Sequence, residues 1–247
     1  MRIQLLGVAA ALSLAAAVTG CSSGATHAAV GINTATSSSP SPSAGESLPG
    51  ADQLSSALLT ANDLGPNFSA QPSGTASPTN DTSKATGCSD LTTLMNETAP
   101  PSPSGGGPAQ GQDQQVILAG GQTGPFVGEF LSSRPSAVLD QRYPTAVTAL
   151  KTCKELNIPT GSTTIDFKLG DVDFGSPGSV AKHMTASVQG VPVNGYLAID
   201  RLSPTVAFVY LYIQVDGDSP QAASGYYHQA VTKADSVLGL TTPSQAA

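Results

Sequence analysis

The segment from Val206 to Ile213 constrains the fold most strongly, because each of its residues is apolar or aromatic. Successive side chains of a β-strand point to opposite faces of a sheet. A strand that is apolar on both faces is typical of the interior of a sheet that is covered on both sides. The sequence therefore predicts a central strand here, with other elements packed on either side of it.

The residues before this strand alternate between apolar and polar, which predicts further strands of the same sheet. Between Thr163 and Leu169, for example, Ile165 and Phe167 share one face while Asp166 lies on the other. Two earlier runs are joined by a short segment that contains two glycines, as in a β-hairpin. The predicted strands are 114–119, 124–131, 163–169, 179–188, 193–202 and 205–215.

Apolar residues at helical spacing predict four helices around this sheet. They begin near Asp52, Asp90, Ser136 and Pro220. The third is expected to extend to about Leu156, with Pro144 kinking or restarting it, and Gly239 is expected to end the fourth. The order of elements predicts a single α+β domain over residues 51–240, a twisted antiparallel sheet with flanking helices.

The amino terminus has the parts of an export signal over residues 1–20. Arg2 precedes an apolar run that is shorter than the roughly 20 residues of a spanning helix. The run ends in Val18-Thr19-Gly20-Cys21, which resembles the bacterial lipobox. That resemblance implies a diacylglyceryl and acyl (palmitate-type) anchor on Cys21, with the chain held at the extracytoplasmic face of the cell membrane. Residues 21–50 are rich in Ser, Thr and Pro and predict a tether, and residues 241–247 predict a disordered tail.

The cysteines predict one disulfide. With Cys21 taken by lipid, Cys88 and Cys153 remain as a pair in an oxidising compartment. Cys153 lies on the apolar stripe of the third helix, which favours a structural bridge. The alternative is two free thiols, one of them catalytic.

Composition and motifs indicate no catalytic residue, metal ligand set or cofactor. Charged residues make up 11% of the chain and the net charge is −7, so the sequence lacks the basic surface that nucleic-acid binding requires. Its histidines, His27, His183 and His228, are not spaced as metal ligands. Acidic pairs such as Asp171 and Asp173 are typical of turns.

Several short motifs resemble the actinobacterial PknH-like extracellular sensor domain, found at the outer end of receptor kinases and in free-standing lipoproteins. They are Leu58–Gly65, Gly87-Cys88, the helix end Leu150–Cys153, and Leu169-Gly170-Asp171. The resemblance implies an antiparallel sheet with flanking helices and a ligand cleft, and it implies no enzymatic chemistry. The chain lacks the second disulfide and the tryptophan that family members commonly carry.

The residues selected as candidate ligand contacts are Tyr196, Arg201, Tyr210 and Tyr212, on the last two strands. Tyrosines on one open sheet face would form an apolar wall with hydroxyl groups, suited to a lipid, glycan or cell-wall fragment. The alternative is ordinary packing under a helix. The functional expectation is a non-catalytic, sensor-like or ligand-binding lipoprotein of the envelope.

Three other functions stay open at this point. A lipid or glycolipid carrier would need a large apolar cavity. A module that docks an envelope protein would use a sheet edge or a surface groove. A cell-envelope hydrolase would require His183 or His228 to meet an acid and a nucleophile in space.

Overall fold

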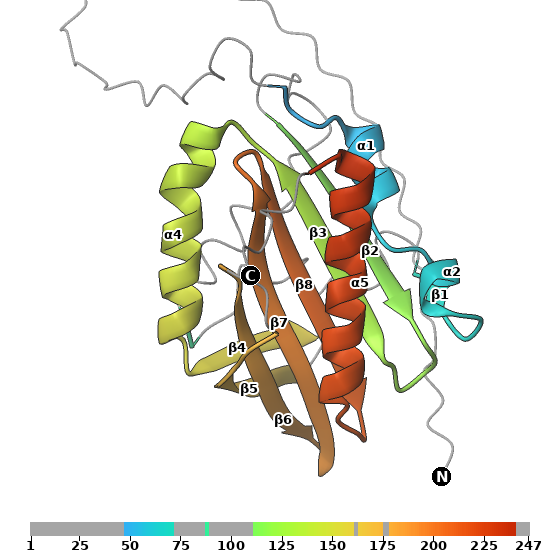
Figure 1. Cartoon of the computed structure of the whole chain (residues 1–247). Helices are drawn as coiled ribbons and strands as arrows, with labels where there is room; N and C mark the ends of the chain where they lie inside the picture. The colour runs from blue at the N-terminus through green and yellow to red at the C-terminus, as the bar shows by residue number, and fades with distance from the viewer. Residues whose placement is uncertain (1–46, 72–86, 89–110, 161–162, 175–177, 241–247) are drawn as a thin grey trace, which may run out of the picture. The chain divides into compact units, whose positions relative to one another are not determined.

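The computed structural model describes residues 47–71, 87–88, 111–160, 163–174 and 178–240. These residues belong to one compact unit with one eight-stranded antiparallel sheet, in the order β1-β2-β3-β8-β7-β6-β5-β4 (Figure 1). The strands are β1 Ser69–Ala70, β2 Gln112–Ala119, β3 Phe126–Ser133, β4 Glu155–Thr160, β5 Thr163–Val172, β6 Val180–Val188, β7 Val191–Ser203 and β8 Val206–Val215. The helices are α1 Ala51–Ala57, α2 Ala61–Leu64, α4 Ser136–Thr152 and α5 Pro220–Leu238. The predicted α+β fold is confirmed.

Strand β8 lies inside the sheet, between β3 and β7, as its apolar sequence predicts. Its residues Phe208, Tyr210 and Tyr212 are buried on the face that α1 and α5 cover. Its intervening residues, such as Val209 and Leu211, are only half-buried on the other face, where α4 packs. Figure 1 shows α4 and α5 on opposite sides of the sheet. The described residues therefore form two cores, one on each face of the sheet.

The first predicted helix is divided into α1 and α2. Leu58 ends α1 with an extended backbone, and both Leu58 and Leu59 are buried. Thr60 then starts α2, where its backbone N–H and its hydroxyl donate to the Asp63 carboxylate at 2.7 and 2.8 Å. The break lets both leucines enter the core. In a continuous helix, two consecutive side chains point in different directions and would not both lie on one narrow apolar stripe.

Helix α4 is continuous through Pro144, so the predicted restart does not occur. Pro144 lies on the exposed side of the helix, where water can reach the carbonyl that its missing N–H leaves free. The predicted end at Leu156 is wrong, because α4 ends at Thr152 and Leu156 lies in strand β4. Strand β4 forms one edge of the sheet and contains Pro159, a residue tolerated in edge strands.

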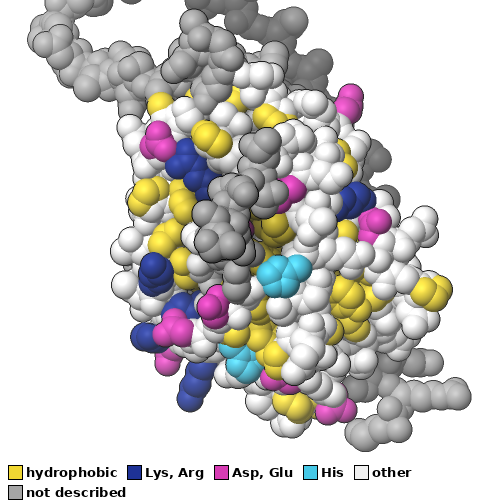
Figure 2. Space-filling view, in the orientation of Figure 1, with side chains coloured by type: hydrophobic (Ala, Val, Ile, Leu, Met, Phe, Trp, Pro, Cys, Tyr) yellow, Lys and Arg dark blue, Asp and Glu magenta, His cyan; other side chains and the backbone are white. Residues whose placement is uncertain are grey.

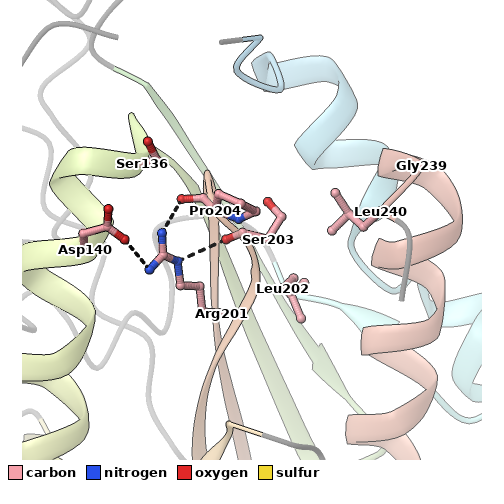
Figure 3. A pocket seen from close by; sticks show the side chains of 8 residues that line it. All are labelled: Ser136, Asp140, Arg201, Leu202, Ser203, Pro204, Gly239 and Leu240. Carbon is pink, nitrogen blue, oxygen red and sulfur yellow. Dashed lines mark hydrogen bonds and ion pairs between the residues drawn. The ribbon is translucent and has the colours of Figure 1, made fainter. Parts of the chain in front are cut away.

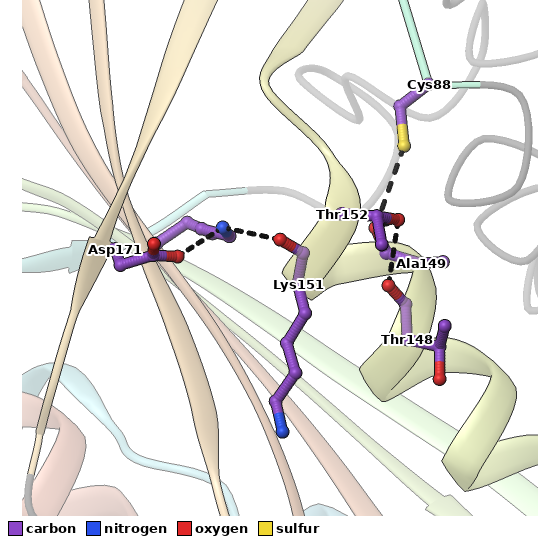
Figure 4. Close-up of polar contacts among 7 residues, drawn as sticks. Cys88, Thr148, Ala149, Lys151, Thr152 and Asp171 are labelled. Carbon is purple, nitrogen blue, oxygen red and sulfur yellow. Dashed lines mark hydrogen bonds and ion pairs between the residues drawn. The ribbon is translucent and has the colours of Figure 1, made fainter.

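Two contacts fix the end of α4, and Figure 4 shows the one that joins the Lys151 carbonyl to the region of Asp171. Cys153 forms the predicted disulfide with Cys88, and their Cα atoms are 5.7 Å apart. The fully buried Lys182 of β6 donates from Nζ to the Lys151 carbonyl at 3.0 Å and also bonds the Asp171 carboxylate. A cation at the carboxyl end of a helix is favourable because the last carbonyls are negative and lack helical partners.

Helix α5 matches its prediction closely. Pro220 occupies its first turn, and Gly239 ends it in the left-handed region at φ 64°. Its buried residues are Ala223, Tyr227, Ala230 and Ala234, which share one stripe.

Several predictions fall outside the described residues. They are the signal over 1–20 with Cys21, nearly all of the tether over 21–50, the helix after Cys88 and the tail over 241–247. Within the described ranges, none of the helices has the length and hydrophobicity to cross a membrane.

Candidate functional site

The three candidate tyrosines are packed beneath α5. Tyr196, Tyr210 and Tyr212 are at most 2% exposed, and their hydroxyls all find acceptors at 2.8 Å. These acceptors are the carboxylate of Asp218, the carbonyl of Ala223 and the side-chain amide of Gln214, respectively. Burial raises the pKa of all three phenols, that of Tyr212 to about 12. Their role in ligand binding stays a prediction.

The same tyrosines belong to an aromatic cluster in this core. Phe174 lies 5.8 Å from Tyr196 and 5.1 Å from Tyr227, between ring centroids. Tyr210 meets Tyr227 edge to face at 5.6 Å. Such geometries favour ring packing beyond the area that they bury. The cluster joins β7, β8 and α5 into one unit.

Arg201 lies apart from the tyrosines, on the α4 side of β7. It pairs with Ala207 in the sheet, whereas Tyr196 pairs with Tyr212. Arg201 is the fifth residue after Tyr196 along the strand, and an odd difference in position puts two side chains on opposite faces. The structure therefore brings the three tyrosines together and does not bring Arg201 to them.

The guanidinium of Arg201 is held by three hydrogen bonds (Figure 3). Its Nε donates to the Ser203 carbonyl at 3.3 Å, and Nη2 donates to the Pro204 carbonyl at 2.8 Å. Its Nη1 donates to Oδ1 of Asp140 on α4 at 2.7 Å. Two of these acceptors are backbone atoms of the β7–β8 turn. The orientation of the guanidinium is thus set mainly by the turn.

Arg201 lines an open cavity of about 650 Å³. Its lining residues come from α4, the β7–β8 turn and the end of α5, and are Ser136, Asp140, Arg201, Leu202, Ser203, Pro204, Gly239 and Leu240. Figure 3 shows Arg201 pointing toward α4, and Leu202 on the side of α5. The volume is within the range of small-molecule sites, about 300–1,000 Å³. One wall is polar and charged and the other is apolar.

The charges around the cavity are unequal in their exposure. The Arg201 side chain is 23% exposed and that of Asp140 is 63% exposed. Ser136, the first residue of α4, also lines the cavity, so the positive end of that helix dipole faces it. The positive charge is held by backbone carbonyls, and the negative charge belongs to an exposed side chain.

His183, one of the two histidines that the hydrolase hypothesis requires, does contact an acidic side chain. His183 lies with Nε2 3.4 Å from Oδ2 of Asp218, and its ring stacks on Tyr196 at 4.7 Å. These partners include no serine, threonine or cysteine nucleophile. His228 lies exposed on α5, with its ring against Tyr227.

Glu129 and Asp200 are buried carboxyl groups that sequence reasoning missed. Oε2 of Glu129 accepts from the Leu59 N–H at 3.1 Å, while Oε1 is buried without a hydrogen-bond partner among the described residues. Burial raises the pKa of Glu129 to about 7. Asp200 accepts from the Tyr227 hydroxyl at 2.8 Å, and burial raises its pKa as well. The sequence contained a signal for the burial of Glu129. In a strand it shares a face with Val127 and Leu131, which are both apolar.

Among the described residues, no group of three or more His, Cys, Asp or Glu side chains is placed to hold a metal ion. On the face shown in Figure 2, basic and acidic side chains are interspersed, without a continuous patch of one sign. The guanidinium of Arg201 presents a positive charge and hydrogen-bond donors at this cavity.

No match to this chain was found among protein-family models or among curated proteins.

Proposed function

We propose that this protein is a lipid-anchored lipoprotein of the extracytoplasmic membrane face, and that its folded domain binds a small envelope ligand without catalysing a reaction. The cavity around Arg201 is the observation that carries the binding part of the proposal. It has the size of a ligand site, one charged anchor fixed by backbone carbonyls, and an apolar wall. The sensor-like role follows the PknH-like resemblance.

The anchoring part rests on Val18-Thr19-Gly20-Cys21 and on the Ser/Thr/Pro-rich residues after it. The Cys88–Cys153 disulfide supports an oxidising compartment. Replacing Cys21 by alanine should move the protein out of the membrane fraction. Retention of the Cys21→Ala chain in that fraction would refute lipid anchoring.

The binding part is tested by native mass spectrometry of the whole chain, purified in detergent micelles from cells that export it. We expect a bound small molecule in addition to any anchor lipid. Its retention should fall in an Arg201→Gln variant and persist in Arg142→Gln, which removes the same charge from an exposed position outside the cavity. A bare protein mass for the wild type would contradict a retained ligand.

A hydrolase is a second candidate, favoured by the contact between His183 and Asp218. Its weakness is that the described partners of His183 provide no nucleophile. We expect His183→Ala to leave ligand binding and any measured turnover unchanged. A turnover that disappears in this variant would favour the hydrolase.

A further inference from the structure

The binding function proposed above leaves the chemistry of the ligand open, and the contacts of Arg201 narrow it. Two backbone carbonyls, of Ser203 and Pro204, position the guanidinium in the absence of a ligand. A guanidinium held in this way loses little freedom when it binds an anion. Arg201 is thus pre-organised as an anchor, and the question is which group it is shaped to receive.

The group that Arg201 holds now is a single carboxylate oxygen. Asp140 contacts Nη1 through Oδ1, and its side chain is largely exposed to water. An exposed ion pair of this kind contributes only about 0–1 kcal/mol, because water screens it and both side chains lose freedom. Asp140 is therefore an easily displaced occupant of an anion position.

Displacement of Asp140 would leave N–H groups of both Nη1 and Nη2 of Arg201 available to a ligand. Nη2 uses one N–H for the Pro204 carbonyl and Nη1 uses one for Asp140. Because each terminal nitrogen carries two hydrogens, both nitrogens could then address one incoming group. Carboxylate and phosphate oxygens match this spacing and form the stronger, bidentate pairs.

The rest of the cavity suits a ligand with an anionic end and an apolar part. Ser136 at the start of α4 adds the positive end of a helix to the polar wall. Leu202, Pro204 and Leu240 form the apolar side.

We infer that the Arg201 cavity binds a ligand through one carboxylate or phosphate group, which takes the place of the Asp140 carboxylate on the guanidinium. The inference rests on the proposed binding function and adds the chemistry of the ligand and the role of Asp140 as an internal competitor.

The test uses inorganic phosphate and acetate as probes, each titrated into the ¹⁵N-labelled whole chain in detergent micelles at constant ionic strength. We expect saturable NMR shifts at the Arg201 Nε–H and at the backbone amides of Ser136 and Ser203. Asp140→Asn should tighten binding about two- to fivefold, the range that corresponds to a surface ion pair. Asp166→Asn, which removes the same charge at an exposed position on β5, should leave the affinity unchanged.

Arg201→Gln should abolish the shifts, and Arg201→Lys should weaken them because an ammonium cannot pair in bidentate fashion. If either variant fails to fold, the Asp140→Asn comparison still decides. Binding of phosphate alone or of acetate alone would support the inference and identify the group. Shifts with neither probe, or only outside the cavity, would overturn it.

Weaker binding in Asp140→Asn would also overturn it, because it would show that Asp140 contacts the ligand. A neutral or cationic molecule recovered with the wild type and seated on Arg201 would leave the proposed function standing and refute the anionic ligand. A bare mass together with saturable phosphate binding would refute a retained envelope ligand and support the anion position.

Discussion

The two faces of the sheet are stabilised in different ways. The face under α5 holds an aromatic core in which Tyr196, Tyr210 and Tyr227 pack together, and it also buries carboxyl groups. The face under α4 holds a mainly aliphatic core around Leu150, Leu156 and Leu169, and the Cys88–Cys153 disulfide lies at its border. One sheet thus carries an aromatic core that contains buried hydrogen bonds on one face and a mainly aliphatic core next to a covalent link on the other.

The buried charges show the same contrast. Under α5, Glu129 and Asp200 have raised pKa values because burial disfavours their charged forms. Under α4, the buried Lys182 bonds a helix carbonyl and Asp171, whose side chain is 78% exposed. We therefore expect pH to change the stability of the face under α5, and reducing agents to change the stability of the face under α4.

The largest effect should come from the aromatic core. Tyr227→Ala removes a fully buried ring and leaves Asp200 without its hydroxyl donor, so we expect a loss of about 5 kcal/mol in the free energy of unfolding. Tyr227→Phe keeps the ring and should lose only about 1–2 kcal/mol. Urea unfolding measures both. Similar losses for the two variants would show that the hydroxyl, and not ring packing, dominates this face.

The disulfide should have the next largest effect. The bridge spans a sequence separation of 65 residues, so the double variant Cys88→Ala/Cys153→Ala should lose about 4 kcal/mol through the greater entropy of its unfolded chain. Dithiothreitol should destabilise the wild type by a similar amount and leave the double variant unaffected. If the reductant changes neither protein, the covalent link does not stabilise the α4 face.

The third largest effect should be the pH dependence of stability that Glu129 causes. Its pKa in the folded protein is about 7, above the ordinary value of 4.5, so the folded state binds the proton more tightly than the unfolded state. The stabilisation by protonated Glu129 is complete below about pH 4.5 and is lost as the pH rises through about 7. The free energy of unfolding should fall by about 3 kcal/mol over this range.

Glu129→Gln is the matched variant for this pH dependence, since it keeps the shape and cannot ionise. Urea unfolding across the same pH range should give a smaller slope for it, with a remainder from Asp200, whose pKa is also raised. An unchanged slope would show that other groups control the pH response of this face.

The smallest effect should come from the ion pair of the α4 face. Asp171→Asn removes the carboxylate beside Lys182, but that carboxylate is exposed and the Lys151 carbonyl remains as a partner. We expect no change in the urea midpoint, because exposed ion pairs are weak. A clear loss would mean that the buried ammonium of Lys182 depends on its counter-ion, and that charge matters on both faces.

The sheet and its central strand were predictable because period-two alternation and the apolar run at Val206–Ile213 are strong local signals. The elements that were missed have weak local signals. Strand β4 was missed because Cys153 and Leu156 continue the helical spacing of α4. The break between α1 and α2 depends on a distant partner, Glu129, which accepts the Leu59 N–H.

The candidate site was less predictable. Arg201 was selected from the sequence, but Asp140 was not, because their contact joins residues 61 positions apart. Tyr210 and Tyr212 were correctly placed on one face, yet which helix covers that face depends on the path of the whole chain. The alternation of a strand alone would have separated Arg201 from Tyr196, since their positions differ by five, which is an odd number.

The two edge strands of the sheet affect how readily neighbouring copies of the protein could aggregate. Strand β4 presents Pro159, which cannot donate a backbone hydrogen bond, and the other outermost strand, β1, has only two residues. Short or proline-containing outer strands are poor templates for pairing with a neighbouring chain. If many copies share one membrane surface, this architecture opposes strand-to-strand aggregation between them.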